Sequence, residues 1–376
     1  MPASIQLFLN NKPADAGLAG QVAQYEVEEN ADMPGALEIT LPLAAANGEL
    51  AYINDGGLQP LARVALLAQA ATGAPACIFD GVVLSHRLHL EAGLVNSTLR
   101  VWCQDYSWMM NMEDKTKEWA DVTDAIVANN IFGQHAVAPD PANLDDDAPA
   151  HTSAGHSLMQ RASDAAFLRN LARRSGKLFR VVGGAAPGAM VGVFARPRLD
   201  AAPVATLTLT DRDKWNVSAL DLDWDATRPT HVQARQKLFS DSGGGSASGD
   251  TADSGLARLG ARDLAAFTGK PMTVLLTVPV DDGGELALRA RALLAESGWF
   301  VRCEGSTELG KLGTVLRVGH IVQLAGLGSV HSGKYYVWSV RHTITQDSHL
   351  MRFVLLRNAV GDPPAGGSGL GGLLGL

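Results

Sequence analysis

The chain has 376 residues, more than the roughly 100 to 150 that one hydrophobic core usually organises, so two or three domains are expected. Its formal net charge is −8, and its lysines and arginines are scattered. A nucleic-acid surface is therefore not predicted, because displacing counterions from phosphates needs a basic stripe. A solvated acidic surface accounts for the charge, and a hydrophobic content of 46% is enough to build cores.

The sequence shows no targeting or membrane-spanning segment. The N-terminal residues lack a basic region followed by an apolar stretch, and nowhere do about 18 apolar residues follow one another. We therefore expect an unexported protein without a membrane anchor. Cys77, Cys103 and Cys303 are an odd number and lack CxxC spacing, so each is expected to be a small buried apolar residue instead of a disulfide partner or zinc ligand.

The first region, residues 1–108, reads as short strands separated by turn residues. Leu37, Ile39 and Leu41 alternate with polar residues, and this period of two is typical of a half-buried strand. Further strands are expected over 21–29, 63–69, 77–90 and 97–104. Strands that recur in this way, with glycine and proline between them, predict a β-barrel or sandwich domain.

Residues 109–200 predict a smaller α/β insert whose clearest element is a helix over 163–176. Ser163 can cap the free amides at its start, and Asp164 suits the positive end of the helix dipole. Gly176 supplies a residue able to adopt positive φ just past the end. The apolar stripe of this helix consists of Phe167, Leu168 and Leu171.

A second β-rich domain is predicted over 201–358. Within it, 240–254 holds almost no apolar residue and cannot offset its own ordering entropy, so it is predicted to be a mobile loop. The tail 359–376, rich in glycine, proline and leucine, is predicted to be flexible. A helix is expected over 281–298, and closing strands over 334–345 and 349–358.

No catalytic, cofactor-binding or metal-binding motif is found. His86 and His89 fall on opposite faces of a predicted strand, which disfavours a shared metal. The carboxylates of 145–147 are consecutive, whereas a helix-loop-helix calcium loop spaces its ligands at alternate positions, so a polar loop is favoured over a calcium site. His342 is expected to be a hydrogen-bonded core or interface residue. The protein is predicted not to be an enzyme and to carry no cofactor.

Three motifs together resemble a known family. Residues 160–172 are similar to the Gln-x-x-Ser-Asp-x-x-Phe-Leu-x-x-Leu-Ala signature of the phage late control D family, the baseplate hub proteins of contractile tails. The closing run 315–358 resembles that family's Ser-Gly-x-Tyr-x-Val element and its final strand ending in Arg-Asn. Phe79-Asp80-Gly81 is similar to an element of its first barrel. The motifs are spread over residues 75–358, nearly the whole chain.

The resemblance implies a mainly β, α+β protein with two tube-protein-like barrels and the smaller insert, related to the N-terminal part of VgrG spikes. Three copies would form a ring with six similar barrels, adapting a six-fold tail tube to a three-fold spike. The barrel and β-helix of full spikes are missing, so the spike would be a separate polypeptide. Implied partners are the tail tube protein, a trimeric spike, other baseplate proteins, and DNA or protein cargo passing without specific binding.

Within such a hub, Phe79, Gly81, Gly333 and Tyr335 are expected to shape barrel turns, and the 163–176 helix to buttress the ring. Ordinary core packing explains the same residues equally well. An acidic lumen, suggested by the net charge, would discourage cargo from sticking. We expect assembly in the bacterial cytoplasm and a place in the baseplate of a virion or tail-like particle.

Three alternatives stay open at this point. One is a hub of a type VI-like secretion system or an extracellular injection particle, which the sequence does not separate from a phage hub. The second is a tail-associated cell-wall hydrolase. The third is a monomeric carbohydrate-binding module.

Overall fold

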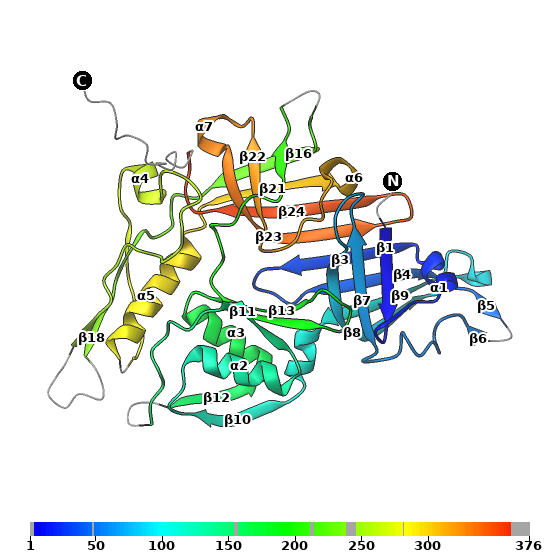
Figure 1. The fold of residues 1–376 in the computed structure, drawn as a ribbon, viewed down its shortest axis with the longest axis horizontal. Coiled ribbons are helices and arrows are strands. Elements are labelled where there is room, and N and C mark those ends of the chain that lie inside the picture. The colour runs from blue at the N-terminus through cyan, green and yellow to red at the C-terminus, as the bar shows by residue number, and fades with distance from the viewer. Residues whose placement is uncertain are drawn as a thin grey trace, which may run out of the picture.

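The structure, a computed structural model, describes residues 4–46, 49–153, 157–210, 214–237, 246–280 and 282–361 (Figure 1). Among these residues the main element is one large, mostly antiparallel sheet, whose principal path runs in the order β16-β21-β24-β23-β3-β4-β9-β8-β7-β1-β2. The two strands off this path are β22, which pairs with β23, and β15, which pairs with β22 in parallel. The fold is mainly β, as predicted.

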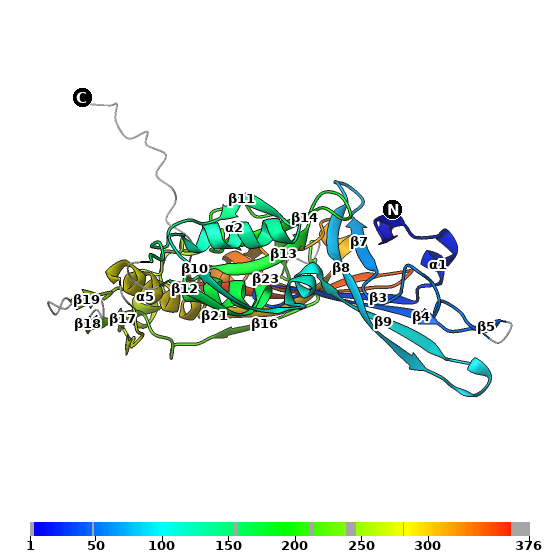
Figure 2. The same cartoon turned by 90° about the horizontal axis from the view of Figure 1, so that it is seen from below.

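The N-terminal region supplies one half of this sheet. Its strands are β1 (Ser4–Leu9), β2 (Lys12–Pro13), β3 (Gln24–Asn30), β4 (Ala36–Pro42), β7 (Arg63–Gln69), β8 (Ala76–His89) and β9 (Thr98–Asp105). The pair β5 (Ala45–Ala46) and β6 (Glu49–Leu50), the helix α1 (Ala16–Gln21) and the 3-10 turns at Ala92–Leu94 and Tyr106–Asn111 complete it. Figure 2 shows the distal parts of β8 and β9 extending from the body as an arm.

The C-terminal region supplies the other half. Its strands are β15 (Thr206–Thr208), β16 (Ala219–Trp224), β21 (Val301–Glu308), β22 (Ile321–Ala325), β23 (Gly333–Ile344) and β24 (His349–Arg357). Two one-turn helices, α6 (Leu309–Leu312) and α7 (Gly328–His331), lie between them. The predicted closing strands are confirmed as the antiparallel hairpin β23–β24.

The two halves meet where β23 pairs with β3, in the register Ser339↔Asn30 to Ile344↔Tyr25. This pairing joins the first and last parts of the chain, and one hydrophobic core covers both halves. Alternation sets the core: Val27, Ile39 and Val340 face it and are fully buried, because successive side chains of a strand point to opposite faces. The strands of both predicted barrel regions therefore belong to one sheet, and the number of closed barrels stays a prediction.

The insert packs beside this sheet as a separate small core (Figure 1). Its elements are β10 (Asp114–Trp119), α2 (Asp124–Gln134), β11 (Ala138–Leu144), β12 (Leu158–Ser163), α3 (Asp164–Arg174), β13 (Leu178–Gly183) and β14 (Met190–Ala195). The predicted helix is confirmed as α3: the Ser163 hydroxyl accepts from Ala166 N, and Gly176 has a φ of +69°. Phe167 and Leu168 point into the insert core, as the stripe predicts.

A satellite unit projects from the C-terminal half. It contains the parallel pair β17 (His231–Gln233) and β20 (Thr273–Leu275), the hairpin β18 (Arg235–Lys237) and β19 (Ser246–Ser248), and the helices α4 (Leu264–Thr268) and α5 (Gly283–Ser297). Asp282 caps α5, so the predicted helix over 281–298 is confirmed. Its core includes Ala247, Leu286 and Leu294.

Two predictions of unordered chain are wrong in part. The predicted mobile loop 240–254 contains β19, because Ala247 is buried against α5 and Asp250 binds Arg235, contacts that the local composition does not reveal. Residues 240–245 lie outside the described residues. The predicted tail 359–376 starts ordered, since Val360 is buried and its amide donates to Arg262 O at 2.8 Å. The remainder, from 362 on, lies outside the described residues.

Among the described helices, none is long and apolar enough to span a membrane.

The assignment of β19 can be tested by introducing a charge at one of two neighbouring positions. Ala247→Asp would place a carboxylate in the satellite core, and an unpaired buried charge is among the changes that cost more than about 2 kcal/mol of stability. Ser246→Asp is the matched control, because Ser246 is exposed, and it should change stability by less than about 0.5 kcal/mol. Urea unfolding followed by circular dichroism measures both. Equal, small effects would restore the loop interpretation.

Candidate functional site

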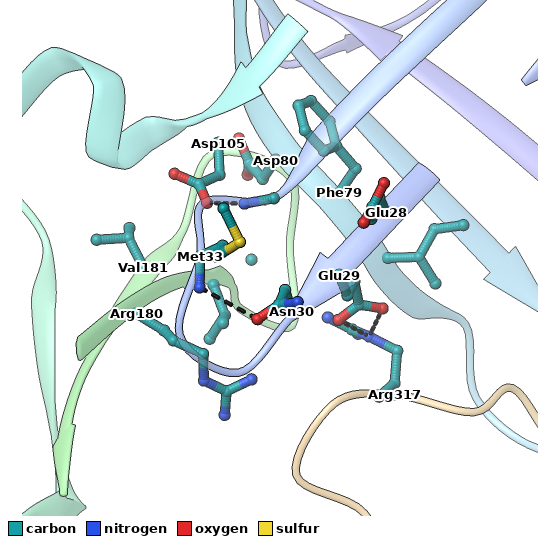
Figure 3. Close-up of a pocket in the computed structure, with 14 residues that line it drawn as sticks. Glu28, Glu29, Asn30, Met33, Phe79, Asp80, Asp105, Arg180, Val181 and Arg317 are labelled. Carbon is teal, nitrogen blue, oxygen red and sulfur yellow. Dashed lines mark hydrogen bonds and ion pairs between the residues drawn. The ribbon is translucent and has the colours of Figure 1, made fainter. Parts of the chain in front are cut away.

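The best-defined polar site lies at the junction where β3 of the N-terminal half meets β23 of the C-terminal half. Glu29, the penultimate residue of β3, is nearly buried, and both of its carboxylate oxygens accept from Arg317 Nε, at 2.6 and 2.8 Å (Figure 3). Arg317 comes from the segment before β22. Residues 288 positions apart are thus joined by a largely buried ion pair, of the kind that is costly to break one side at a time.

A pair of buried histidines continues this site into the C-terminal hairpin. His342 Nε2 lies 3.5 Å from Glu29 Oε1, and His342 Nδ1 lies 2.9 Å from His349 Nε2. The two imidazoles come from adjacent strands, β23 and β24, and their rings meet edge to face. One of the two facing nitrogens must donate and the other accept, so the pair cannot carry two full positive charges without losing this bond.

Burial and charge set the protonation of this site. Burial alone would raise the pKa of the Glu29 carboxyl, but the Arg317 charge and the contact with His342 together hold it below its ordinary value. Burial, with a smaller contribution from the neighbouring His342, lowers the pKa of His349 to about 3. Glu29 is therefore an anion and the His349 imidazole is neutral at neutral pH.

A second buried carboxylate joins the N-terminal half to the insert. Asp80 of β8 accepts from Arg63 Nε at 3.0 Å and from the amide of Gly188, in the turn between β13 and β14, at 2.9 Å. Burial raises the pKa of its carboxyl, and the Gly188 and Arg63 contacts oppose that rise. Close by, Asp105 accepts from the amides of Gly35 and Ser107, and burial likewise raises its pKa.

These carboxylates line a small cavity where the three parts of the chain converge (Figure 3). Its volume is about 40 Å³, enough for a few water molecules and well below the size of an ordinary ligand pocket. The arrangement suits holding parts of a protein together more than it suits binding a substrate.

Phe79 and Gly81 of the first predicted motif belong to this junction. Phe79 is buried and lines the cavity. Gly81 lies where β8 passes between β7 and β9, and a Cβ there would overlap the carbonyl of Gln104 as well as the Phe79 ring. A close backbone approach of this kind excludes any larger residue.

Gly333 and Tyr335 are brought together around the last residue of β24, Arg357. The fully buried Arg357 guanidinium donates to the carbonyls of Leu259, Ser332 and Gly361, at 3.1, 2.9 and 2.7 Å. Its centre lies 5.2 Å from the centroid of the Tyr335 ring. Gly333 has a φ of +134°, and a Cβ there would overlap the guanidinium. The motif thus encloses an arginine that holds the end of the sheet.

The predicted residues at the start of α3, Ser163 and Asp164, form a separate group of polar contacts within the insert. Asp164 is 2% exposed and binds Lys115 Nζ at 2.5 Å, His135 Nε2 at 2.8 Å and Gln160 Nε2 at 2.7 Å. Burial would raise the pKa of its carboxyl, but these hydrogen bonds together lower it below its ordinary value. The Ser163 hydroxyl also donates to Asn111 Oδ1 at 2.6 Å, so α3 is fixed to the chain that enters the insert.

Other candidate groups are engaged in local contacts. Asp145 and Asp147 bind Arg198 and Lys177, at 2.6 and 2.8 Å, so the acidic run forms ion pairs. His86 contacts the carbonyl of Leu58 and His89 contacts Glu91. His151 contacts Asp124, while His156 lies outside the described residues. No group of three or more possible metal ligands occurs in the described part of the chain.

The three cysteines are buried and unpaired, as predicted from their spacing. Burial raises the pKa of the Cys77 thiol to about 11 and that of Cys303 to about 12. All three therefore stay protonated and unreactive at neutral pH.

Sequence reasoning missed the charged half of the junction. Glu29, Arg317, His349 and Asp80 are single polar residues on or beside strands, and their partners are distant in sequence, so no local spacing marks them. The signal for Arg357 was present as the Arg-Asn ending of the last strand. Only the structure shows that it is enclosed by backbone carbonyls.

Comparison with known proteins gives one family match. The family model described as the Alg8 N-terminal domain matches residues 46–346. The predicted late control D family is thus not the one whose model matches. That prediction was based on three short motifs and their order, each of which is only moderately specific. No curated protein matches the sequence.

Solved structures share the fold over nearly the whole chain. A tail protein from Neisseria meningitidis is 14% identical, with a TM-score of 0.65, over 96% of this chain and 98% of its own. A 43 kDa prophage tail protein from Shewanella oneidensis is 13% identical, with a TM-score of 0.61, over 96% and 100%. An Escherichia coli component of the type VI secretion system is 12% identical, with a TM-score of 0.56, over 97% and 80%.

The histidine pair makes a testable contribution to stability. Because the pKa of His349 falls from its ordinary 6.5 to about 3 on folding, the unfolded chain binds more protons between these values. Stability from this residue is therefore fully present above pH 6.5 and is lost as the pH falls toward 3.

We expect His349→Gln, whose side-chain amide can donate to or accept from His342, to flatten the fall in unfolding free energy between pH 6.5 and 4, as measured by urea titration at each pH. His89→Gln, at an exposed position, should leave the slope of the unmodified protein. Equal slopes for all three proteins would show that His349 is not held neutral by the fold.

Proposed function

The chain belongs to the Alg8 N-terminal domain family, and from its full-length likeness in fold to tail proteins we propose that it is a structural hub subunit in the baseplate of a contractile tail or injection system. The observation that supports this proposal most is how much of each chain is matched. The likeness extends over 96% of this chain and 98% of the Neisseria tail protein, so the whole architecture is shared and not one common module.

The geometry of the sheet supports a ring-forming role. One face of the large sheet packs on the hydrophobic core, and much of the other face, which we call the open face, carries exposed polar side chains. Near Tyr336 and Leu356 that second face is covered by a smaller apolar cluster. The charged or titratable residues of the open face, followed by register from β16 to β8, are Asp221, Asp223, Glu304, Glu308, Arg302, Arg352, Arg341, Glu28, Glu26, Glu38, Arg100, Arg87 and His89. A wide polar sheet face of this kind is suited to lining a water-filled channel.

We propose a homotrimer in which three copies surround such a channel. Closed cyclic symmetry would let a six-fold tail tube stack on one side and a separate three-fold spike dock on the other, if each copy presents two similar barrels. Other baseplate proteins would bind the outside. The carboxylates on the open face outnumber the arginines, which supports an acidic lumen through which DNA or protein cargo passes without specific binding.

The junction around Glu29 and Arg317 would then have a mechanical role. It fixes the N-terminal half, the C-terminal half and the insert relative to one another, which a subunit under load during contraction requires. The proposed protein is not an enzyme and uses no cofactor. We place its assembly in the bacterial cytoplasm and its final position in the baseplate of a virion or tail-like particle.

A hub of a type VI-like secretion system is the second candidate. The likeness to the Escherichia coli type VI component, over 97% of this chain, favours it. That neighbour extends beyond the matched part, since only 80% of it is covered. We propose a spike on a separate polypeptide in either setting.

The stoichiometry and the absence of lytic activity test this proposal together. Light scattering on the purified chain should give a species of three times the 39.5 kDa chain mass, and with its spike partner a species of that mass plus the mass of the spike trimer. A peptidoglycan zymogram should show no clearing. A monomer under both conditions would contradict the hub, and clearing by the purified chain would favour the cell-wall hydrolase.

A further inference from the structure

Two strand segments of the large sheet, β16 and the distal part of β8, each leave one edge unpaired within the described residues. At one end, β16 pairs with β21 alone. Before the path continues through β7, β1 and β2, β7 pairs with β8 only as far as Val82, and the loop before β7 reaches Val83. Beyond that point, within the described residues, the backbone of Leu84–His89 forms hydrogen bonds only with β9. Figure 2 shows this part of β8 extending beside β9 as an arm. Exposed edges of this kind are ready to pair with another chain unless something covers them.

The two edges carry opposite charge. On the open face of β16 the side chains of Asp221 and Asp223 are exposed, and on the open face of β8 those of Arg87 and His89 are exposed. Within the described residues Arg87, Asp221 and Asp223 have no ion-pair partner. Arg87 thus places a positive charge on the β8 edge beside the His89–Glu91 contact, whereas Asp221 and Asp223 make the β16 edge acidic.

The directions of the edges are also compatible. Each edge is six residues long, Ala219–Trp224 in β16 and Leu84–His89 in β8. Every pairing along the path from β16 to β8 is antiparallel, and there are seven of them. An odd number of reversals leaves β8 running opposite to β16. Copies related by a rotation about an axis along the strands would therefore meet in antiparallel register.

We infer that the β8 edge of one copy pairs with the β16 edge of a second copy of this chain, head to tail. The inference rests on the proposed ring and names the contact that closes it. Pairing would extend the sheet from one subunit to the next and keep both polar series on the same open face. It would place Arg87 of one copy, with His89 beside it, against Asp221 and Asp223 of its neighbour, where opposite charges on the arginine and an aspartate across a strand pair are favourable.

Exposed apolar side chains at both edges agree with this assignment. Leu88 is 43% exposed on the β8 arm, and Trp224 is 54% exposed at the end of β16. Leu88 lies on the face opposite Arg87 and His89, and Trp224 is the last residue of β16. Pairing of the two edges would bring both side chains next to the neighbouring copy. A heterologous contact of this kind closes into a ring when its rotation divides the full circle.

Charge reversal on the full chain tests the contact. The first variant combines Arg87→Glu with His89→Glu, the second combines Asp221→Lys with Asp223→Lys, and the third carries all four changes. Glu118→Lys, on an exposed strand position of the insert, is the matched control for a charge change elsewhere. Thermal melting checks that each variant folds, which is expected because all the altered side chains are exposed.

Analytical ultracentrifugation over a concentration series measures the dissociation constant of the oligomer. We expect it to rise at least about 10-fold in each edge variant, because like charges then face each other. In the four-change variant it should return to within about 3-fold of the value for the unmodified chain. The control should associate like the unmodified chain. An oligomer that ignores both reversals, or one that the four changes do not restore, would overturn this contact and leave the ring standing. A chain that stays monomeric at every concentration, with or without spike partner, would overturn both.

Discussion

The pairing of β3 with β23 is the constraint on which the rest of the structure depends. It joins strands from opposite ends of the sequence, and its buried charges make the junction specific: Glu29 must find Arg317 and His342, because an uncompensated carboxylate in that position would be costly. With this seam formed, one core serves both halves, the insert is fixed beside it through Asp80, and the open polar face becomes continuous. The proposed channel wall therefore depends on a pairing between a strand near the N-terminus and a strand near the C-terminus.

The sequence was informative where structure is local. The α3 helix follows from Ser163, Asp164 and the spacing of Phe167 and Leu168, and the closing hairpin follows from a period of two. The joined sheet could not be predicted, because the register between β3 and β23 depends on partners more than 300 residues apart. For the same reason β19 looked like a loop: Ala247 acquires its burial from α5, and nothing in its own segment is apolar enough to show it.

In the candidate site, too, local features could be predicted from the sequence and long-range contacts could not. Gly81 and Gly333 were expected to shape turns, and the structure places each where a side chain would overlap a neighbour, one against the backbone of β9 and the other against Arg357. Short motifs identified a type of architecture better than a family: the fold agrees with tail proteins, whereas the matching family model is the Alg8 N-terminal domain. Motifs built from glycines and core residues report packing geometry, which several families can share.

In the proposed ring, the open face of the sheet lines a channel with three-fold symmetry. An electron cryomicroscopy reconstruction of the assembled protein tests this most directly, because it shows both the symmetry and which face points inward. We expect three copies, with Asp221, Glu28 and Arg341 facing the lumen and the insert on the outside. A ring with this face turned outward, or an assembly without three-fold symmetry, would contradict it.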